Sequence, residues 1–187
     1  HFCALKYPGM RGLIIRKTRE SLSEAALVTF EDKVLHEYDP LKDGPRRNFR
    51  QAYHYPNKSE IVGGGLDKPG KIMSTEYDMI YVQEATELDL ADWLALTTRL
   101  RNNVMPYQQL IADCNPDAPT HWLWVRSQSG VTRMLNSQHK DNPRLYRHGA
   151  WTKEGQEYLD TLDRLGYIDE ATGERVGTEY QRLALGL

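Results

Sequence analysis

The sequence has 187 residues, of which 40% are hydrophobic, and 24 Lys and Arg stand against 26 Asp and Glu. This length predicts one domain with a substantial core, and the near-neutral charge balance gives no whole-chain signal for nucleic-acid binding. No run approaches the ~18 apolar residues of a membrane span, and no signal-peptide pattern opens the chain.

The predicted elements alternate between strand and helix along the chain. Short runs rich in β-branched residues predict buried strands, whereas apolar residues at intervals of three and four predict helices. Such alternation implies crossover connections and a mainly parallel sheet. In chain order, the first elements are a strand over residues 12–17, a helix over 18–36 that begins at Ser21 or Ser23, a loop or short hairpin arm over 38–51, and a strand pair over 52–62 that turns at residues 56–58 and ends at the glycines 63–65.

The second half continues this pattern. Asp89 is a good N-cap for a helix that runs to about Asn102, and Asp117 or Thr120 is the predicted cap of a helix that carries Trp122. The remaining predicted elements are strands over residues 79–82, 109–114 and 131–136, a helix over 152–165, a polar Gly-rich turn over 169–177, and a short helix from about Thr178.

Two of these strands deliver polar side chains at their C-terminal ends. Glu84 follows the strand over residues 79–82, and the strand over residues 109–114 ends in the sequence Asp113-Cys114-Asn115-Pro116. Ligands of open α/β sheets bind at the C-terminal ends of the strands. In nucleotide-hydrolysing P-loop folds, a carboxylate in the first place aligns the attacking water, and a polar group in the second senses the γ-phosphate. The layout therefore predicts part of a nucleotide-driven motor.

The phosphate-binding loop of such folds is missing from the sequence. It has the pattern G-x-x-x-x-G-K-[ST], but no Lys-Ser or Lys-Thr follows the glycines 63–65 at that spacing, and Lys17-Thr18 follows a strand instead of a loop. The sequence also begins at His1. We therefore expect an internal part of a longer protein, with the loop upstream. Cys3, Cys114 and the histidines lack metal-ligand spacing, so no metal is assigned to them and a reduced cytosolic state is predicted.

Four phrases of the sequence point to one family. Residues 7–18 are YPGMRGLIIRKT, residues 65–72 are GLDKPGKI, residues 81–87 are YVQEATE and residues 113–116 are DCNP. In this order and spacing, they resemble the ATPase domain of the large terminase subunit of tailed bacteriophages. The closing residues 180–186 resemble the segment that leads from that domain towards the family's nuclease domain.

The resemblance implies a three-layer α/β P-loop NTPase fold of the RecA-like, additional-strand type, with a mainly parallel central sheet. It implies that residues 1–187 are a partial ATPase domain, with about 140–187 as a C-terminal subdomain or lead-in to a nuclease domain outside this sequence. The implied activity is ATP hydrolysis that drives viral double-stranded DNA into the capsid. Because the phosphate loop is missing, this chain alone is expected to be inactive.

The resemblance also implies ligands and partners. The cofactors are ATP and magnesium, and the partners are double-stranded DNA, the portal protein, the small terminase subunit and further copies of the chain in a ring. No membrane is involved, and the implied location is the host-cell cytoplasm, transiently on the procapsid. The alternatives are another P-loop ATPase, such as a helicase, and a non-catalytic structural relative that has lost its phosphate loop.

Three residues receive roles from the resemblance. Glu84 corresponds to the catalytic glutamate that polarises the attacking water, and Gln83 occupies the Walker B position where the family prefers an Asp near magnesium. A neutral amide binds a metal-bound water but does not neutralise the ion. Asn115 resembles the coupling motif that links phosphate state to movement. The structural alternatives are a solvated Glu84 after a strand and an Asn-Pro turn at Asn115.

Several basic residues are further candidates. Arg16, Arg19 and Lys71 are cationic candidates near the nucleotide or a subunit boundary, where an arginine would stabilise charge in the transition state. Arg46, Arg47 and Arg50 form the densest positive run, with Phe49 inside it, and are candidates for contact with the DNA backbone. Solvated surface side chains are the alternative for each of these residues.

Overall fold

The computed structural model describes residues 1–115 and 117–177. The chain divides into two compact units, residues 1–114 and 115–187. The subdomain boundary predicted near residue 140 stays a prediction. Among the described residues, no helix combines the length and the apolar character needed to cross a membrane.

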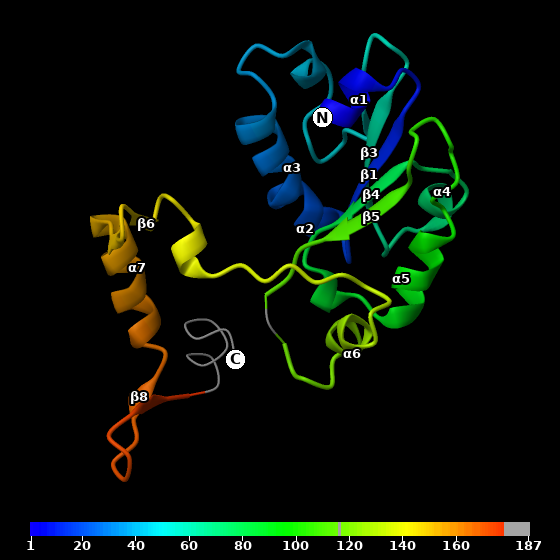
Figure 1. The fold of residues 1–187 in the computed structure, drawn as a ribbon. Helices are drawn as coiled ribbons and strands as arrows, with labels where there is room; N and C mark the ends of the chain where they lie inside the picture. The colour runs from blue at the N-terminus through cyan, green and yellow to red at the C-terminus, as the bar shows by residue number, and fades with distance from the viewer. Residues whose placement is uncertain (116, 178–187) are drawn as a thin grey trace. The chain divides into compact units, whose positions relative to one another are not determined.

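The first unit is a five-stranded sheet between two layers of helices (Figure 1). The sheet order is β2-β3-β1-β4-β5; β2 is antiparallel to β3, and the other neighbours are parallel. Helices α2 and α3 cover one face, and α4 and α5 cover the other. The strands are β1 (Arg11–Arg16), β2 (Ala52–His54), β3 (Glu60–Gly65), β4 (Met79–Val82) and β5 (Gln109–Ala112). The helical elements are α1 (Phe2–Lys6), α2 (Arg19–Glu24), α3 (Ala26–Thr29), the π-helical turn η1 (Phe30–Val34), the 3-10 turns η2 (Pro40–Lys42) and η3 (Ala85–Glu87), α4 (Gly70–Met73) and α5 (Leu90–Thr97).

This architecture confirms the predicted three-layer α/β fold with a mainly parallel sheet. Strand β1 is buried on both faces of the sheet, and β4 is buried on one face and half-buried on the other, as expected for parallel strands between helical layers. Their side chains Leu13, Ile15, Ile80 and Val82 are at most 1% exposed. Ile14 lies in β1, and Leu110 and Ile111 lie in β5, so the apolar runs predicted as strands over residues 12–17, 79–82 and 109–114 lie in the sheet.

The glycines 63–65 do not end the predicted strand pair but form the last part of β3. Close packing explains why glycine is needed there. A Cβ atom on Gly64 would lie 2.2 Å from the side chain of Ile72, and one on Gly65 would lie 2.1 Å from the backbone nitrogen of Arg19. The missing side chains therefore let neighbouring elements approach the strand.

The predicted helix over residues 18–36 is broken into α2, α3 and η1, with the backbone leaving the helical region at Ala25 (φ −120°, ψ −80°). No Pro or Gly in this stretch signals the break. Thr18, instead of Ser21 or Ser23, is the N-cap, because its side-chain oxygen accepts from the backbone N–H of Ser21 at 3.2 Å. Asp89 caps α5 as predicted: its side chain accepts from the N–H of Asp92, and the side chain of Asp92 accepts from the N–H of Asp89.

In the second unit, the described residues form two α-helices, a 3-10 turn and two short hairpins. They are α6 (Trp122–Gln128), the 3-10 turn η4 (His139–Asp141), the hairpin of β6 (Tyr146–Arg147) and β7 (Ala150–Trp151), α7 (Lys153–Asp163), and the hairpin of β8 (Tyr167–Ile168) and β9 (Arg175–Val176). Helix α7 lies within the predicted helix over residues 152–165. The turn predicted over residues 169–177 is correct in its first part, but Arg175–Val176 form β9. The helix predicted from Thr178 lies outside the described residues.

Two predictions in this unit are wrong. Residues 131–136 form no strand, and Val131 is 64% exposed; β-branched residues favour a strand only where a neighbour pairs with them. His121, instead of Asp117 or Thr120, caps α6, with its ring Nδ1 3.3 Å from the N–H of Leu123.

A buried carboxylate organises the sheet at the start of β4. Oδ2 of Asp78 accepts from the backbone N–H of Arg11 at 3.1 Å and from the amide of Asn102 at 2.7 Å. Oδ1 accepts from the N–H groups of Val104 at 2.8 Å and Met105 at 3.1 Å. These bonds draw the chain after α5 towards β4, which explains why α5 ends at Thr97 instead of near Asn102.

We expect Asp78→Asn to lower the free energy of unfolding by about 3 kcal/mol, because the new amide group faces donors where the carboxylate accepted. Burial opposes ionisation, but the hydrogen bonds outweigh it and lower the pKa of Asp78. Its contribution to stability is therefore present above the ordinary Asp pKa of about 4 and is lost as the pH falls through the lowered folded value.

Urea unfolding at several pH values measures this effect. Asp43→Asn is the control, since Asp43 is exposed. Equal stability of the two variants at neutral pH would show that Asp78 is not a structural centre.

Candidate functional site

The C-terminal ends of β1, β4 and β5 meet at one edge of the sheet, because the three strands are parallel and in register. Ile15 pairs with Val82, and Val82 pairs with Ala112. The ladder continues one residue beyond each strand: the N–H of Gln83 donates to the carbonyl of Ile15 at 2.8 Å, and that of Asp113 donates to the carbonyl of Val82 at 3.2 Å. This edge therefore collects the polar groups that follow the strands.

Glu84 occupies this edge with an unusual backbone. Its φ of 53° and ψ of 59° lie in the left-handed region, which few residues other than glycine adopt. The next residue, Ala85, is fully buried and donates its N–H to the carbonyl of Asp113 at 2.9 Å. Glu84 is thus held between β4 and β5 and is only partly exposed. Its catalytic role stays a prediction.

Gln83 has a buried side-chain oxygen, Oε1, that accepts no hydrogen bond from the described residues. A buried carbonyl oxygen without a donor lowers the free energy of unfolding by about 1–3 kcal/mol. Such atoms are commonly hydrogen-bonded by a ligand or a water. This observation fits an amide that accepts from a water on a bound cation. No group of three or more His, Cys, Asp or Glu among the described residues is arranged to hold a metal ion directly.

Asp113 is a member of the edge to which the sequence assigned no role. The hydroxyl of Tyr81 donates to its Oδ1 at 2.7 Å. Burial, and then this hydrogen bond, raise the pKa of Tyr81, so the phenol stays protonated and donates. Asn115 follows Asp113 by two residues and belongs to the second unit, so its role as a coupling residue stays a prediction.

Arg16 lies at the same edge and forms a two-pronged ion pair. Its Nε donates to Oε2 of Glu87 at 2.9 Å, and its Nη2 donates to Oε1 at 2.6 Å. These bonds are the main reason why the pKa of Arg16 is raised and that of Glu87 is lowered. The sequence patterns predict no role for Glu87, although it stands in the phrase YVQEATE with Glu84.

Arg19 and Lys71 have different placements. The Nη2 of Arg19 donates to the carbonyls of Arg47, at 3.2 Å, and of Arg50, so the guanidinium supports the loop that follows η2. Burial lowers the pKa of Arg19, and its Nη1 is buried without a partner among the described residues. Lys71 belongs to α4, and its proposed contact with nucleotide stays a prediction.

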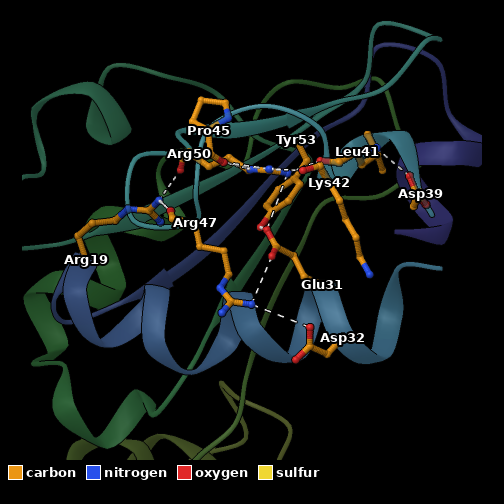
Figure 2. A network of polar contacts seen from close by, with 10 residues as sticks. All are labelled: Arg19, Glu31, Asp32, Asp39, Leu41, Lys42, Pro45, Arg47, Arg50 and Tyr53. Atoms are coloured by element: carbon orange, nitrogen blue, oxygen red, sulfur yellow. Dashed lines mark hydrogen bonds and ion pairs between the residues drawn. The ribbon is translucent and has the colours of Figure 1, made fainter. Parts of the chain in front are cut away.

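The basic run 46–50 belongs to a loop, residues 40–50, that is folded around one arginine (Figure 2). Arg50 is 6% exposed. Its guanidinium donates to the carbonyls of Leu41, of Lys42 at 2.5 Å, and of Pro45 at 3.0 and 3.1 Å, and it lies 5.1 Å from the ring centre of Tyr53. Arg50 is therefore an internal anchor of the loop, which corrects its prediction as a DNA contact.

The other arginines of this loop face outwards to different degrees. Arg46 is exposed, and Phe49 is 74% exposed. Nη1 of Arg47 lies 3.3 Å from Oε2 of Glu31 and 3.9 Å from Oδ1 of Asp32, two residues of η1. Oε1 of Glu31 also accepts from the hydroxyl of Tyr53 at 2.9 Å (Figure 2). Arg46 and Phe49 are thus exposed on a loop whose conformation is held by the polar contacts of Arg47 and Arg50.

Comparison with known proteins decides the family. The sequence profile described as phage terminase large subunit matches residues 4–165, which is most of the chain. The chain belongs to the phage terminase large subunit family. Comparison with curated proteins gave no match.

Solved structures agree with this family in fold. The large terminase of a thermophilic bacteriophage matches with 16% identity and a TM-score of 0.69, over 97% of this chain and 41% of that one. The same terminase in complex with ATP-γ-S matches with 17% identity and a TM-score of 0.65, over 100% of this chain and 41% of that one. The large terminase ATPase domain of Thermus phage P74-26 matches with 17% identity and a TM-score of 0.55, over 97% of this chain and 77% of that one. This terminase sequence thus spans about two fifths of the first of these proteins.

We expect Arg50→Lys to destabilise this terminase unit by about 2 kcal/mol, because a lysine has no planar fork to reach the carbonyls of Leu41, Lys42 and Pro45 at once. Limited proteolysis should then cut within residues 40–50 sooner. Arg46→Lys is the control, since Arg46 is exposed. Equal cleavage rates and equal unfolding curves for the two variants would contradict the anchoring role.

Proposed function

We propose that this terminase chain is part of an ATPase motor that moves viral double-stranded DNA into the capsid. The observation that supports it most is the placement of Glu84, held in a left-handed turn at the C-terminal edge of β4, between β1 and β5. Nucleotides bind at this edge in open α/β sheets. The large terminase of the thermophilic bacteriophage has been solved with ADP and with ATP-γ-S, which favours nucleotide as the ligand of this chain.

In this proposal, Glu84 accepts a hydrogen bond from the attacking water and directs it at the γ-phosphate. Phosphoryl transfer depends mainly on positioning and on charge stabilisation, so the carboxylate acts by orienting the water. The unpartnered Oε1 of Gln83 fits a water in the shell of a magnesium ion. When bound, that ion would neutralise phosphate charge, which Gln83 as a neutral amide does not.

The phosphate-binding loop that this chemistry needs is not among the 187 residues. We infer that a further segment of a longer protein supplies it. Strand β5 pairs with β4 on one side, no described strand pairs with its other side, and Ile111 is 39% exposed. An apolar edge strand of this kind has room for a further strand.

Several partners belong to the same proposal. DNA would meet the loop of residues 40–50 through Arg46 and Arg47, whose charges suit phosphate groups, and through the exposed ring of Phe49. The portal protein, the small terminase subunit and further copies of the chain would complete the motor on the procapsid, in the host-cell cytoplasm.

In the longer protein, we expect Glu84→Gln to lower single-turnover ATP hydrolysis by about 10²-fold or more. Nucleotide affinity should stay unchanged, because the substitution keeps the shape of the side chain and removes its charge. Rapid-quench hydrolysis and equilibrium nucleotide binding measure the two quantities. Glu20→Gln is the control, since Glu20 is an exposed residue of α2. Rapid hydrolysis by Glu84→Gln would refute the catalytic role.

For the 187-residue chain alone, we expect weak nucleotide binding, no ATP turnover, and self-association. The reasons are the missing phosphate loop and the exposed edge of β5. Calorimetry with ATP and light scattering on the purified chain measure these properties. A monomer that binds ATP with micromolar affinity would contradict the need for an additional segment.

A further inference from the structure

The turn that carries Glu84 is tied to the sheet by a side-chain fork. Arg16 is the last residue of β1, and Glu87 ends η3, three residues after Glu84. Their two hydrogen bonds, at 2.9 and 2.6 Å, join both edges of the carboxylate to one guanidinium. A bidentate pair fixes the angle between the groups as well as the distance. The fork therefore fixes the far end of the turn to the neighbouring strand.

Glu84 needs such support because of its backbone. A left-handed non-glycine residue costs on the order of 1–3 kcal/mol and persists only where its surroundings impose it. The N–H of Gln83 is bonded to β1 before the turn, and the N–H of Ala85 is bonded to Asp113 after it. These bonds fix the start of the turn. The fork fixes its end, and the buried side chains of Ala85 and Leu88 hold the turn against the protein interior.

The charges around the fork agree with this role. The hydrogen bonds to Glu87 are the largest cause of the raised pKa of Arg16, and the charges of Glu84 and Asp113 add to it. Arg16 thus stands among three carboxylates and directs its Nε and Nη2 at one of them. Because Nε and Nη2 of Arg16 already donate to Glu87, this pair is better placed to hold the turn than to bind a phosphate group.

We propose that Arg16 and Glu87 are positioning residues that aim the Glu84 carboxylate at the attacking water without touching the nucleotide. The proposal rests on the proposed function, because it requires Glu84 to be catalytic. It assigns Arg16 a different role from that of a direct cationic stabiliser.

The test is a double-mutant cycle in the longer protein with Arg16→Gln, Glu87→Gln and their combination. We expect each single change to lower the single-turnover rate by about 10- to 100-fold, because a misplaced catalytic group loses rate on this scale. Nucleotide affinity should not change. The double variant should lose no more than either single variant, since all three remove the same fork. Arg16→Lys, which keeps the charge without the fork, should behave like Arg16→Gln.

Lys17→Gln is the matched control. Lys17 is the next residue along the chain and donates to Asp92 at 2.7 Å, but this ion pair leads to α5 and does not tie the Glu84 turn. Its rate should stay close to that of the unchanged protein. Melting temperatures equal to that of the control show that lost rate is not lost folding, and Arg16→Lys provides the second measurement if Glu87→Gln is unstable.

Two outcomes overturn the positioning role and leave the function standing. In the first, Glu84→Gln is inactive while Glu87→Gln hydrolyses ATP like the control. In the second, Arg16→Gln weakens nucleotide binding while Glu87→Gln does not lower the rate, which would mean that Arg16 acts on the nucleotide itself. Normal hydrolysis by Glu84→Gln would instead refute the proposed catalytic site and, with it, the need for positioning.

Discussion

The alignment of the three parallel strands depends on the buried carboxylate of Asp78. It accepts from the start of β1, through the N–H of Arg11, and from the chain before β5, through Asn102, Val104 and Met105. One side chain thus sets the relative position of β1, β4 and β5 at their N-terminal ends. Because the ladders continue in register, the opposite ends of the strands bring Arg16, Gln83 and Asp113 together. The residues of the candidate site follow the C-terminal ends of the strands, and Asp78 aligns these strands at their N-terminal ends.

Arginine illustrates how one residue type takes separate structural roles. Arg16 forms an ion pair at the sheet edge, Arg19 supports a loop through backbone carbonyls, and Arg50 forms the centre of that loop. Arg46 is exposed, and its contact with DNA is a proposal. The sequence presents all four as equivalent positive charges. What separates them is which acceptors the fold places within reach, and most of those acceptors are carbonyls that every residue possesses.

Much of the fold could be predicted from local patterns, because the buried strands are apolar and β-branched and Asp89 is a strong helix cap. Gln83 and Glu84 could be placed at a strand end for the same reason, and the family resemblance followed from the order of the phrases. Other features depend on distant partners. The glycines of β3 are explained by close contact with Ile72 and Arg19. Residues 131–136 have no strand beside them within the described part of the chain. The hydrogen-bond partners of Asp78 lie 24 or more residues away in the sequence. Single-sequence patterns contain none of this pairing.

The left-handed backbone of Glu84 sets stability and chemistry against each other at one residue. Glycine adopts these angles without the steric cost that a side chain brings, so replacing Glu84 by glycine would relax the turn while removing its carboxylate. If Glu84 has the proposed catalytic role, selection for more stable variants at this position would therefore favour variants that lack the catalytic carboxylate. Under the proposed function, the chemistry of the Glu84 carboxylate accounts for a glutamate in a conformation that disfavours any side chain.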